Sequence, residues 1–238
     1  MSRLKSPEVL ASLRQMSQAI CSESAAQIQK PRAKALPLGL GRMDEMLPEA
    51  GLPRGAVVEF AAPRGLGGVT TLALSACASA QAEARLRGGN STAGAFCAWI
   101  EPCPSLFAPA VARAGVDLSR LLVVRPELSD LAKVSVRIAS SHIVQVVVID
   151  TVGLPGAPSL ERLDRWANVV RRLALSIEKS DTTIVLMTDS MVMRSMPLPV
   201  AMRLEVQRLS DERLSVRVAK ERRGRISSPV AIELKKTA

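Results

Sequence analysis

Aromatic side chains are scarce in this 238-residue chain, which contains 2% Phe, Trp and Tyr and no Tyr at all. Proteins that bind single-stranded nucleic acid usually stack bases on exposed aromatic rings. The few aromatic residues here lie mostly inside apolar segments, where a role in the core is expected. We therefore expect any contact with DNA to be weak and mainly electrostatic.

Signals for metal binding, secretion and membrane insertion are also missing. The four cysteines form no Cys-x-x-Cys pair, and the one histidine, His142, is distant from them in the sequence. No apolar run reaches the roughly 18 residues of a membrane span, and no secretory signal follows Met1. These features predict a cytoplasmic protein with reduced thiols, no metal site and no membrane contact.

The overall composition is that of a folded domain. The chain is 47% hydrophobic and 23% charged, which excludes disorder over most of its length. Its 32 Lys and Arg residues outnumber 22 Asp and Glu residues and give a formal charge of +10. A positive field of this size favours polyanions or acidic protein surfaces as partners.

The N-terminal residues 1–34 predict a helical arm and linker that are separate from a core domain at residues 35–238. Pro7–Ile20 is typical of a helix, with Ser6 as its N-cap. Its narrow apolar stripe consists of Val9, Leu13, Met16 and Ile20. This stripe can pack either on the domain or on another protein. The following segment is rich in Ser, Ala and Gln and ends in the basic run Lys30–Lys34.

The core predicts an α/β fold with a mainly parallel sheet flanked by helices, because short β-branched runs alternate with amphipathic segments. The expected strands are Ala56–Phe60, Ala95–Ile100, Leu121–Val124, Ile143–Ile149 and Thr183–Met187. A C-terminal β-hairpin is expected from Leu214–Ala219 and Val230–Leu234. The expected helices are Thr70–Arg87, Leu106–Ala114, Ser129–Ser141 and Ser159–Lys179.

A strand, a glycine-containing turn and a helix follow one another where a phosphate-binding loop would lie. The strand ends near Phe60, Gly67 and Gly68 can form the turn, and Thr70 or Thr71 can supply the hydroxyl that holds Mg²⁺. A working loop also needs a lysine that reaches the β- and γ-phosphates. No lysine occurs between positions 34 and 133. The predicted nucleotide site is therefore degenerate.

A carboxylate follows the apolar strand that ends at Ile149. Asp150 stands where a Walker-B aspartate would hold Mg²⁺. Many buried strands also end in an Asp that caps the next turn. Without the lysine, the capping role is favoured over the metal role.

An ordered set of segments resembles the RecA recombinases. In RecA order the chain has Gly39, Asp44, Leu47, 51–63, 96–101, 115–122, Asp150, 183–190, 217–220 and 226–229. The similarity covers about residues 36–234 and is far more specific as a set than any one piece. It implies a RecA-like core.

The departures from RecA that bear on catalysis lie in the ATP site. Ala62 replaces the first glycine of the loop, and Gly68 replaces the lysine, or Val69 does if one residue is inserted. Cys103 matches the glutamate that activates water, and Asp189 matches the polar sensor of the γ-phosphate. Phosphoryl transfer depends on such charges and positioning, so the chain is not expected to be an enzyme or to need a cofactor. The segments that match the DNA-binding loops, 153–158 and 191–199, are also shortened.

This combination resembles the ImuA family, accessory proteins of bacterial SOS mutagenesis. The resemblance implies an adaptor for translesion DNA synthesis that binds ImuB, with RecA as a further candidate partner and an error-prone polymerase reached indirectly. Two alternatives stay open: a SulA-like inhibitor of cell division that binds FtsZ, and a nucleotide-dependent DNA-binding ATPase with an unusual cation such as Arg64. Whether the chain self-associates is not predicted.

A basic segment near the C-terminus supplies the candidate binding residues. Lys220 matches a RecA segment that reaches the ATP of a neighbouring subunit, and Arg222, Arg223 and Arg225 enlarge the charge beside it. They could bind an acidic patch on ImuB, a RecA subunit or DNA phosphates. They could also form only a solvated rim. The scarce aromatic residues and shortened loops favour protein over DNA.

Overall fold

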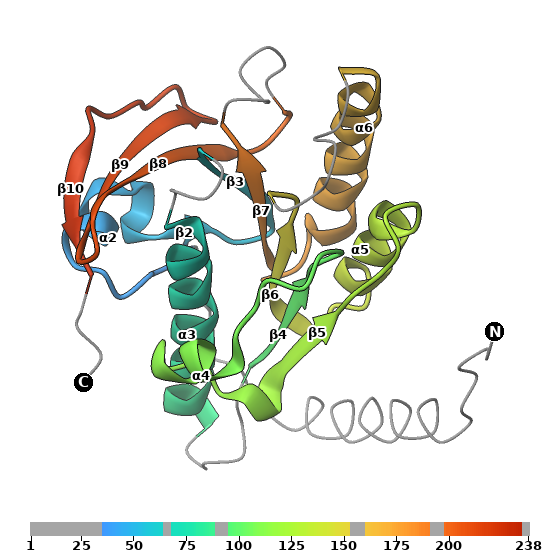
Figure 1. Ribbon diagram of the computed structural model, residues 1–238, viewed down its shortest axis with the longest axis horizontal. Helices are drawn as coiled ribbons and strands as arrows, with labels where there is room; N and C mark the ends of the chain where they lie inside the picture. Colours follow the sequence, from blue (N-terminus) through green and yellow to red (C-terminus); the bar gives the residue numbers. More distant parts are fainter. Residues whose placement is uncertain (1–34, 64–67, 89–94, 153–159, 191–197, 235–238) are drawn as a thin grey trace. The chain divides into compact units, whose positions relative to one another are not determined.

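A computed structural model describes residues 35–63, 68–88, 95–152, 160–190 and 198–234. Within residues 160–190, side chains are described from residue 166 onward. The predicted arm at residues 1–34 lies outside these ranges. An eight-stranded sheet with the order β10-β9-β8-β3-β7-β6-β4-β5 forms the centre of the core (Figure 1). A small antiparallel pair of β1 (Ala35–Leu36) and β2 (Leu52–Pro53) precedes it.

The predicted parallel sheet is confirmed. Its parallel strands are β3 (Ala56–Ala62), β4 (Phe96–Ile100), β5 (Leu121–Val124), β6 (Val144–Asp150) and β7 (Thr183–Asp189). Strand β3 pairs with β7 and β4 pairs with both β5 and β6, all in parallel. Parallel strands are covered on both faces, so their side chains are mostly apolar. The bounds of β5 are as predicted, and those of the other four strands differ by one or two residues.

The expected C-terminal hairpin is present, but it belongs to a larger unit. Strand β9 (Arg213–Glu221) pairs antiparallel with β10 (Val230–Glu233) and also with β8 (Met202–Ser210). Strand β8 in turn pairs in parallel with β3 and joins the hairpin to the sheet. The sequence analysis missed β8, although its residues alternate between apolar and polar, which is the pattern of a strand with one buried face.

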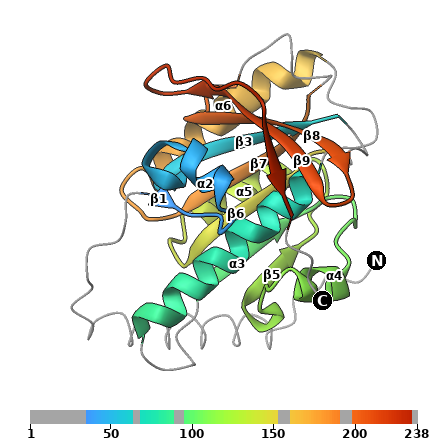
Figure 2. The ribbon, with the colours of Figure 1, turned by 90° about the vertical axis from the view of Figure 1, so that its left-hand side faces the viewer.

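Helices cover both faces of the sheet (Figures 1 and 2). Helices α3 (Val69–Gly88) and α4 (Ala108–Arg113) lie on one side, and α5 (Leu131–Ala139) and α6 (Leu160–Ile177) lie on the other. The predicted helices are confirmed, with shorter ends for α4, α5 and α6. The short helices α2 (Arg42–Met46), η1 (Pro48–Ala50) and η2 (Leu118–Arg120) were not predicted. Among the described residues, none of the helices is long and apolar enough to cross a membrane.

The alternation of side chains along each strand divides the core into two clusters. In β3, Val58 and Phe60 point towards α3, whereas Val57 packs with the cluster under α6. On α6, Val170, Leu173 and Ile177 are fully buried, and their spacing of three and four residues places them on one face of the helix. The carboxyl ends of the parallel strands position the polar residues described next.

Candidate functional site

Three acidic side chains lie at the carboxyl edge of the parallel strands. Asp150 ends β6, Asp189 ends β7, and Glu101 directly follows β4. Ligands of open α/β sheets usually bind at this edge. The position of the predicted Asp150 is thus the expected one for a nucleotide site, and its surroundings decide which chemistry is available.

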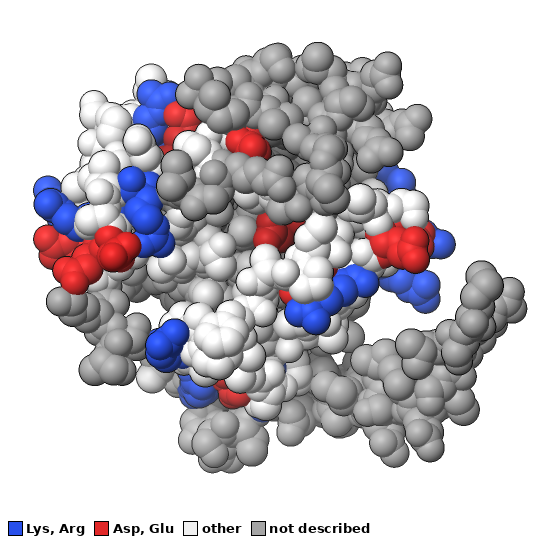
Figure 3. Space-filling model, in the orientation of Figure 1, with Lys and Arg blue, Asp and Glu red and all other residues white. Residues whose placement is uncertain are grey.

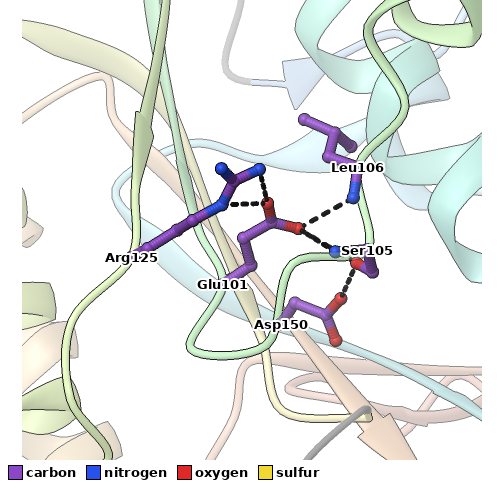
Figure 4. Close-up of polar contacts among 5 residues, drawn as sticks. All are labelled: Glu101, Ser105, Leu106, Arg125 and Asp150. Carbon is purple, nitrogen blue, oxygen red and sulfur yellow. Dashed lines mark hydrogen bonds and ion pairs between the residues drawn. The ribbon is translucent and has the colours of Figure 1, made fainter.

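Glu101 is fully buried, and groups of the chain itself bind both of its carboxylate oxygens (Figure 4). Its Oε2 accepts hydrogen bonds from the backbone N–H groups of Ser105 and Leu106, each at 3.0 Å. Its Oε1 accepts hydrogen bonds from Nε and one Nη of Arg125 at 3.0 and 2.8 Å. Burial alone would raise the pKa of Glu101, but these bonds outweigh burial and lower the pKa below its ordinary value.

Asp150 shares one hydroxyl with Glu101. Ser105 Oγ lies 3.0 Å from Oε2 of Glu101 and 3.2 Å from Oδ2 of Asp150. The other oxygen of Asp150 accepts the backbone N–H of Val152 at 2.9 Å. Burial raises the pKa of Asp150, and the two hydrogen bonds offset this only in part. The side chain therefore caps the turn after β6, which is the role that the sequence favoured.

At the predicted phosphate loop, the described residues are apolar and closely packed. Val69 is the first residue of α3 and is only 6% exposed, in the core cluster under that helix. Gly68 has a φ of 65°, and a Cβ at this position would lie 2.5 Å from Cδ2 of Leu214. Gly67 lies outside the described residues. An extended cationic side chain at position 68 or 69 would have to displace this packing.

The remaining residues of the predicted site are dispersed. Thr70 is exposed and Thr71 is half-buried, both in the first turn of α3. Ala62 is buried in β3 in register with Asp189 of β7. Cys103, which matches the RecA glutamate, packs partly against the core cluster on the α5 and α6 side. Among the described residues, no group of three or more His, Cys, Asp and Glu side chains could hold a metal ion.

A second buried charge lies in β3 and was missed in the sequence. Glu59 is fully buried and accepts the hydroxyl of Thr188 at 2.7 Å, and Nη1 of Arg203 lies 3.6 Å from the same oxygen. Burial raises the pKa of Glu59 more than Arg203, Thr188 and Lys220 together lower it. The signal was present, since Glu59 is the one charged residue in the apolar run 56–62.

The predicted basic segment forms a defined turn after β9. Arg222, Arg223 and Arg225 are exposed, and Gly224 between them has a φ of 78°. The carboxylate of Glu221 accepts the backbone N–H groups of Arg223 and Arg225 at 2.8 and 3.4 Å. These bonds hold the turn in one conformation, with its arginine side chains on the surface.

Two contacts of this segment were not expected. Arg223 forms an ion pair with Glu49 at 3.4 Å. Lys220 is half-buried and donates to the carbonyl of Leu198 at 2.9 Å. The side of the molecule that carries β8–β10 shows Lys and Arg interspersed with Asp and Glu (Figure 3). Arg222 and Arg225 are therefore the clearest candidates for contact with a partner.

The fold and its polar edge are those of an open α/β protein with a mostly parallel sheet. A family model, the RecA N-terminal domain, matches residues 8–193. The chain belongs to the RecA N-terminal domain family, as the sequence resemblance implied.

Individual relatives match only in part. The RecA proteins of Cutibacterium acnes and Frankia alni are 34% and 33% identical to this chain over 119 and 124 residues, which cover 50% and 52% of this chain and 31% and 33% of theirs. RecA of Mesorhizobium japonicum is 28% identical over 201 residues, 76% of this chain and 51% of its own length. The chain thus spans about a third to a half of the curated relatives it matches.

Proposed function

We propose that this chain is a non-catalytic RecA-like adaptor in bacterial SOS mutagenesis, with the role of an ImuA protein. It binds ImuB through its basic turn and links an error-prone polymerase complex to damaged DNA. RecA is a second candidate partner, and DNA contributes only weak electrostatic contacts. The polymerase is reached through ImuB.

We infer the absence of catalysis from one observation, the packing at the start of α3. Val69 is buried and Gly68 lies against Leu214, so neither position presents a cation to a triphosphate. Stabilisation of the terminal phosphate by a lysine is a central part of catalysis in nucleotide-hydrolysing loops. The chain instead uses this space for its core.

The acidic edge supports the same proposal. Glu101 and Asp150 accept hydrogen bonds from Ser105, Leu106, Val152 and Arg125. A Mg²⁺ ion would have to compete with these internal donors. Cys103 packs as a small hydrophobic residue and has no role as a base.

The partner surface is inferred from exposure and preorganisation. Arg222 and Arg225 lie on a turn whose backbone is fixed by Glu221. A turn whose backbone is already ordered loses less conformational entropy when it binds, and arginine forms bidentate bonds with carboxylates. An acidic patch on a protein fits this surface.

Calorimetric titration with ATP, with and without Mg²⁺, tests the absence of catalysis. We expect no binding at micromolar concentrations and no release of phosphate. Micromolar binding together with steady turnover would contradict the proposal and support the ATPase alternative.

Co-purification with ImuB tests the adaptor role. The double variant Arg222→Glu, Arg225→Glu should bind ImuB at least about tenfold more weakly. Arg113→Glu, Arg171→Glu is the matched control, since it makes the same charge change at exposed positions of α4 and α6. Equal loss in both variants would show that only net charge matters. Binding to FtsZ with arrest of division, and none to ImuB, would favour the division inhibitor instead.

A further inference from the structure

Ile226 is among the most exposed large apolar side chains that the structure describes. It is 75% exposed and directly follows Arg225 of the basic turn. A single exposed apolar side chain is common on protein surfaces and needs no explanation by itself. Two features of the surroundings make Ile226 informative: the backbone around it is fixed, and two neighbouring arginines are available to a partner.

The backbone directly after Ile226 is anchored to β9. Ser227 donates its backbone N–H to the carbonyl of Val218 at 3.1 Å, and its Oγ accepts the N–H of Val218 at 2.9 Å. The same hydroxyl donates to Sδ of Met46 in α2 at 3.6 Å. Because Ser227 is held by both β9 and α2, the Ile226 side chain projects into solvent from an ordered backbone.

The start and the middle of the turn are also held. The backbone N–H of Gly224 donates to the carbonyl of Glu221 at 2.9 Å, which closes the turn after β9. The ion pair of Arg223 with Glu49 connects the turn to η1. The segment 221–227 is therefore preorganised over its whole length, which lowers the entropy that a partner has to overcome.

The two outer arginines of the turn keep their charge available. Arg222 and Arg225 are exposed, and within the described part of the chain neither forms an ion pair. Arg217 on the same strand differs, because it pairs with Glu205 at 2.7 Å. A cation that the chain itself does not neutralise can attract an acidic partner.

We infer that the turn binds an acidic segment of another protein that carries a large apolar side chain between its carboxylates. The carboxylates bind Arg222 and Arg225, for which arginine has the matching geometry, and the apolar side chain packs on Ile226. Ile226 thereby determines specificity. The inference deepens the proposed function by giving the chemistry of the partner at the same turn, and its biological role rests on that function.

Two other occupants fit this surface less well. DNA phosphates would attract the arginines but offer no apolar surface to Ile226. Some proteins insert an isoleucine between base pairs. Ile226, however, lies at the base of the turn beside the anchored Ser227, whereas Gly224 lies at its tip. A second copy of the chain is disfavoured because each copy carries a formal charge of +10.

The test uses the full chain and two labelled synthetic peptides of equal charge, Asp-Glu-Leu-Phe-Asp-Glu and Asp-Glu-Ser-Ser-Asp-Glu. Fluorescence anisotropy measures binding, and amide shifts in NMR spectra locate it. We expect the Leu-Phe peptide to bind, the Ser-Ser peptide to bind at least about tenfold more weakly, and the shifts to centre on residues 222–227. Absence of binding, or equal binding of both peptides, overturns the inference.

Variants of Ile226 separate its role from that of the charges. Ile226→Ser should weaken binding of the Leu-Phe peptide at least about tenfold and leave the Ser-Ser peptide unaffected. Ile226→Leu keeps a large apolar side chain and should bind like the wild type. Leu175→Ser is the matched control, because Leu175 is 72% exposed on α6, and it should bind both peptides normally. Unchanged binding of the Leu-Phe peptide to Ile226→Ser overturns the inference.

The arginine variant and two further measurements identify the occupant. Arg222→Glu, Arg225→Glu should weaken binding of both peptides, because both are acidic. Short duplex DNA that loses as much affinity in Ile226→Ser as the Leu-Phe peptide does would assign the turn to DNA and overturn the inference. Dimerisation of the wild type that Ile226→Ser abolishes would assign it to a second copy and overturn it too. If ImuB fails to bind while the peptide results hold, the proposed function fails and the inference stands.

Discussion

Arg125 donates Nε and one Nη to the same carboxylate oxygen of Glu101, at 3.0 and 2.8 Å. The pair joins the end of the edge strand β5 to the turn after β4. Glu101 is fully buried, while the Arg125 side chain is 50% exposed. The arginine thus supplies the charge that makes a buried carboxylate tolerable at this edge.

Replacement of this arginine should destabilise the fold. We expect Arg125→Ala to lower the free energy of unfolding by about 1–2 kcal/mol, less than for a fully buried pair because water screens the arginine. Urea unfolding at pH 7 measures this loss. Arg171→Ala, on the exposed face of α6, should change stability by less than about 0.5 kcal/mol. An equal loss in both variants would contradict a specific role for the pair.

The same pair predicts a pH dependence. The folded-state pKa of Glu101 lies below its unfolded value, so its stabilisation is present above about pH 4.3 and is lost as the pH falls through the folded pKa. The difference in stability between wild type and Arg125→Ala should therefore shrink in that acidic range. Unfolding curves at about pH 3.5 and pH 7 check this, and a constant difference would argue against it.

The contribution of Glu59 to stability should have the opposite pH dependence. Its folded-state pKa is raised by burial, so its contribution to stability falls as the pH rises from about 4.3 through the folded pKa. Glu59→Gln removes this titration. The stability of the variant relative to wild type should therefore improve as the pH increases across this range. Urea unfolding of both proteins at several pH values measures the trend, and a flat or falling difference would contradict it.

Gly68 and Gly224 both have a positive φ. Comparing their alanine variants therefore separates the effect of packing on stability from the effect of backbone strain. In Gly68→Ala the new methyl group would lie 2.5 Å from Leu214, whereas Gly224→Ala meets no atom within 4 Å. Both variants carry backbone strain of about 1 kcal/mol, and Gly68→Ala should lose a further ~1–3 kcal/mol from the clash. Thermal or urea unfolding compares them. Equal losses of unfolding free energy in the two variants would mean that the Leu214 side chain moves aside without cost.

Variants of Val69 and Leu86, both on α3, test whether position 69 is part of the hydrophobic core. Position 69 matches the RecA lysine if one residue is inserted. Val69→Lys should lower the free energy of unfolding by at least about 2 kcal/mol, because it buries a charge or forces the start of α3 to move. Leu86→Lys, at a position of α3 that is 86% exposed, should change it by less than about 0.5 kcal/mol. Urea unfolding provides the comparison. A stable Val69→Lys variant that binds ATP would show that the site still accepts a cation.

The fold was largely predictable because each strand of the parallel sheet is a continuous apolar run. Strand β8 was missed because half of its residues are polar, and its place beside β3 depends on a pairing between distant segments. In the site, Asp150 was recognised from its position after an apolar strand. The same signal was available for Glu101, which follows Ile100, but its bonds to Ser105 and Arg125 were not predictable. Ser105 lies four residues after Glu101 in the same turn, whereas Arg125 follows β5 and only the pairing of β5 with β4 brings it close.

Local patterns along the chain determined the α/β architecture, the absence of a lysine in the phosphate loop and the basic segment after β9, since each depends on residue types close together in sequence. The tertiary structure alone decided that Val69 and Leu214 fill the space near that loop, that internal donors bind Glu101 and Asp150, and that β5 is left as an apolar sheet edge. The physical reason is that burial, ion pairing and edge exposure all depend on which distant segments become neighbours. Strand order sets those neighbours, and no single stretch of sequence encodes it.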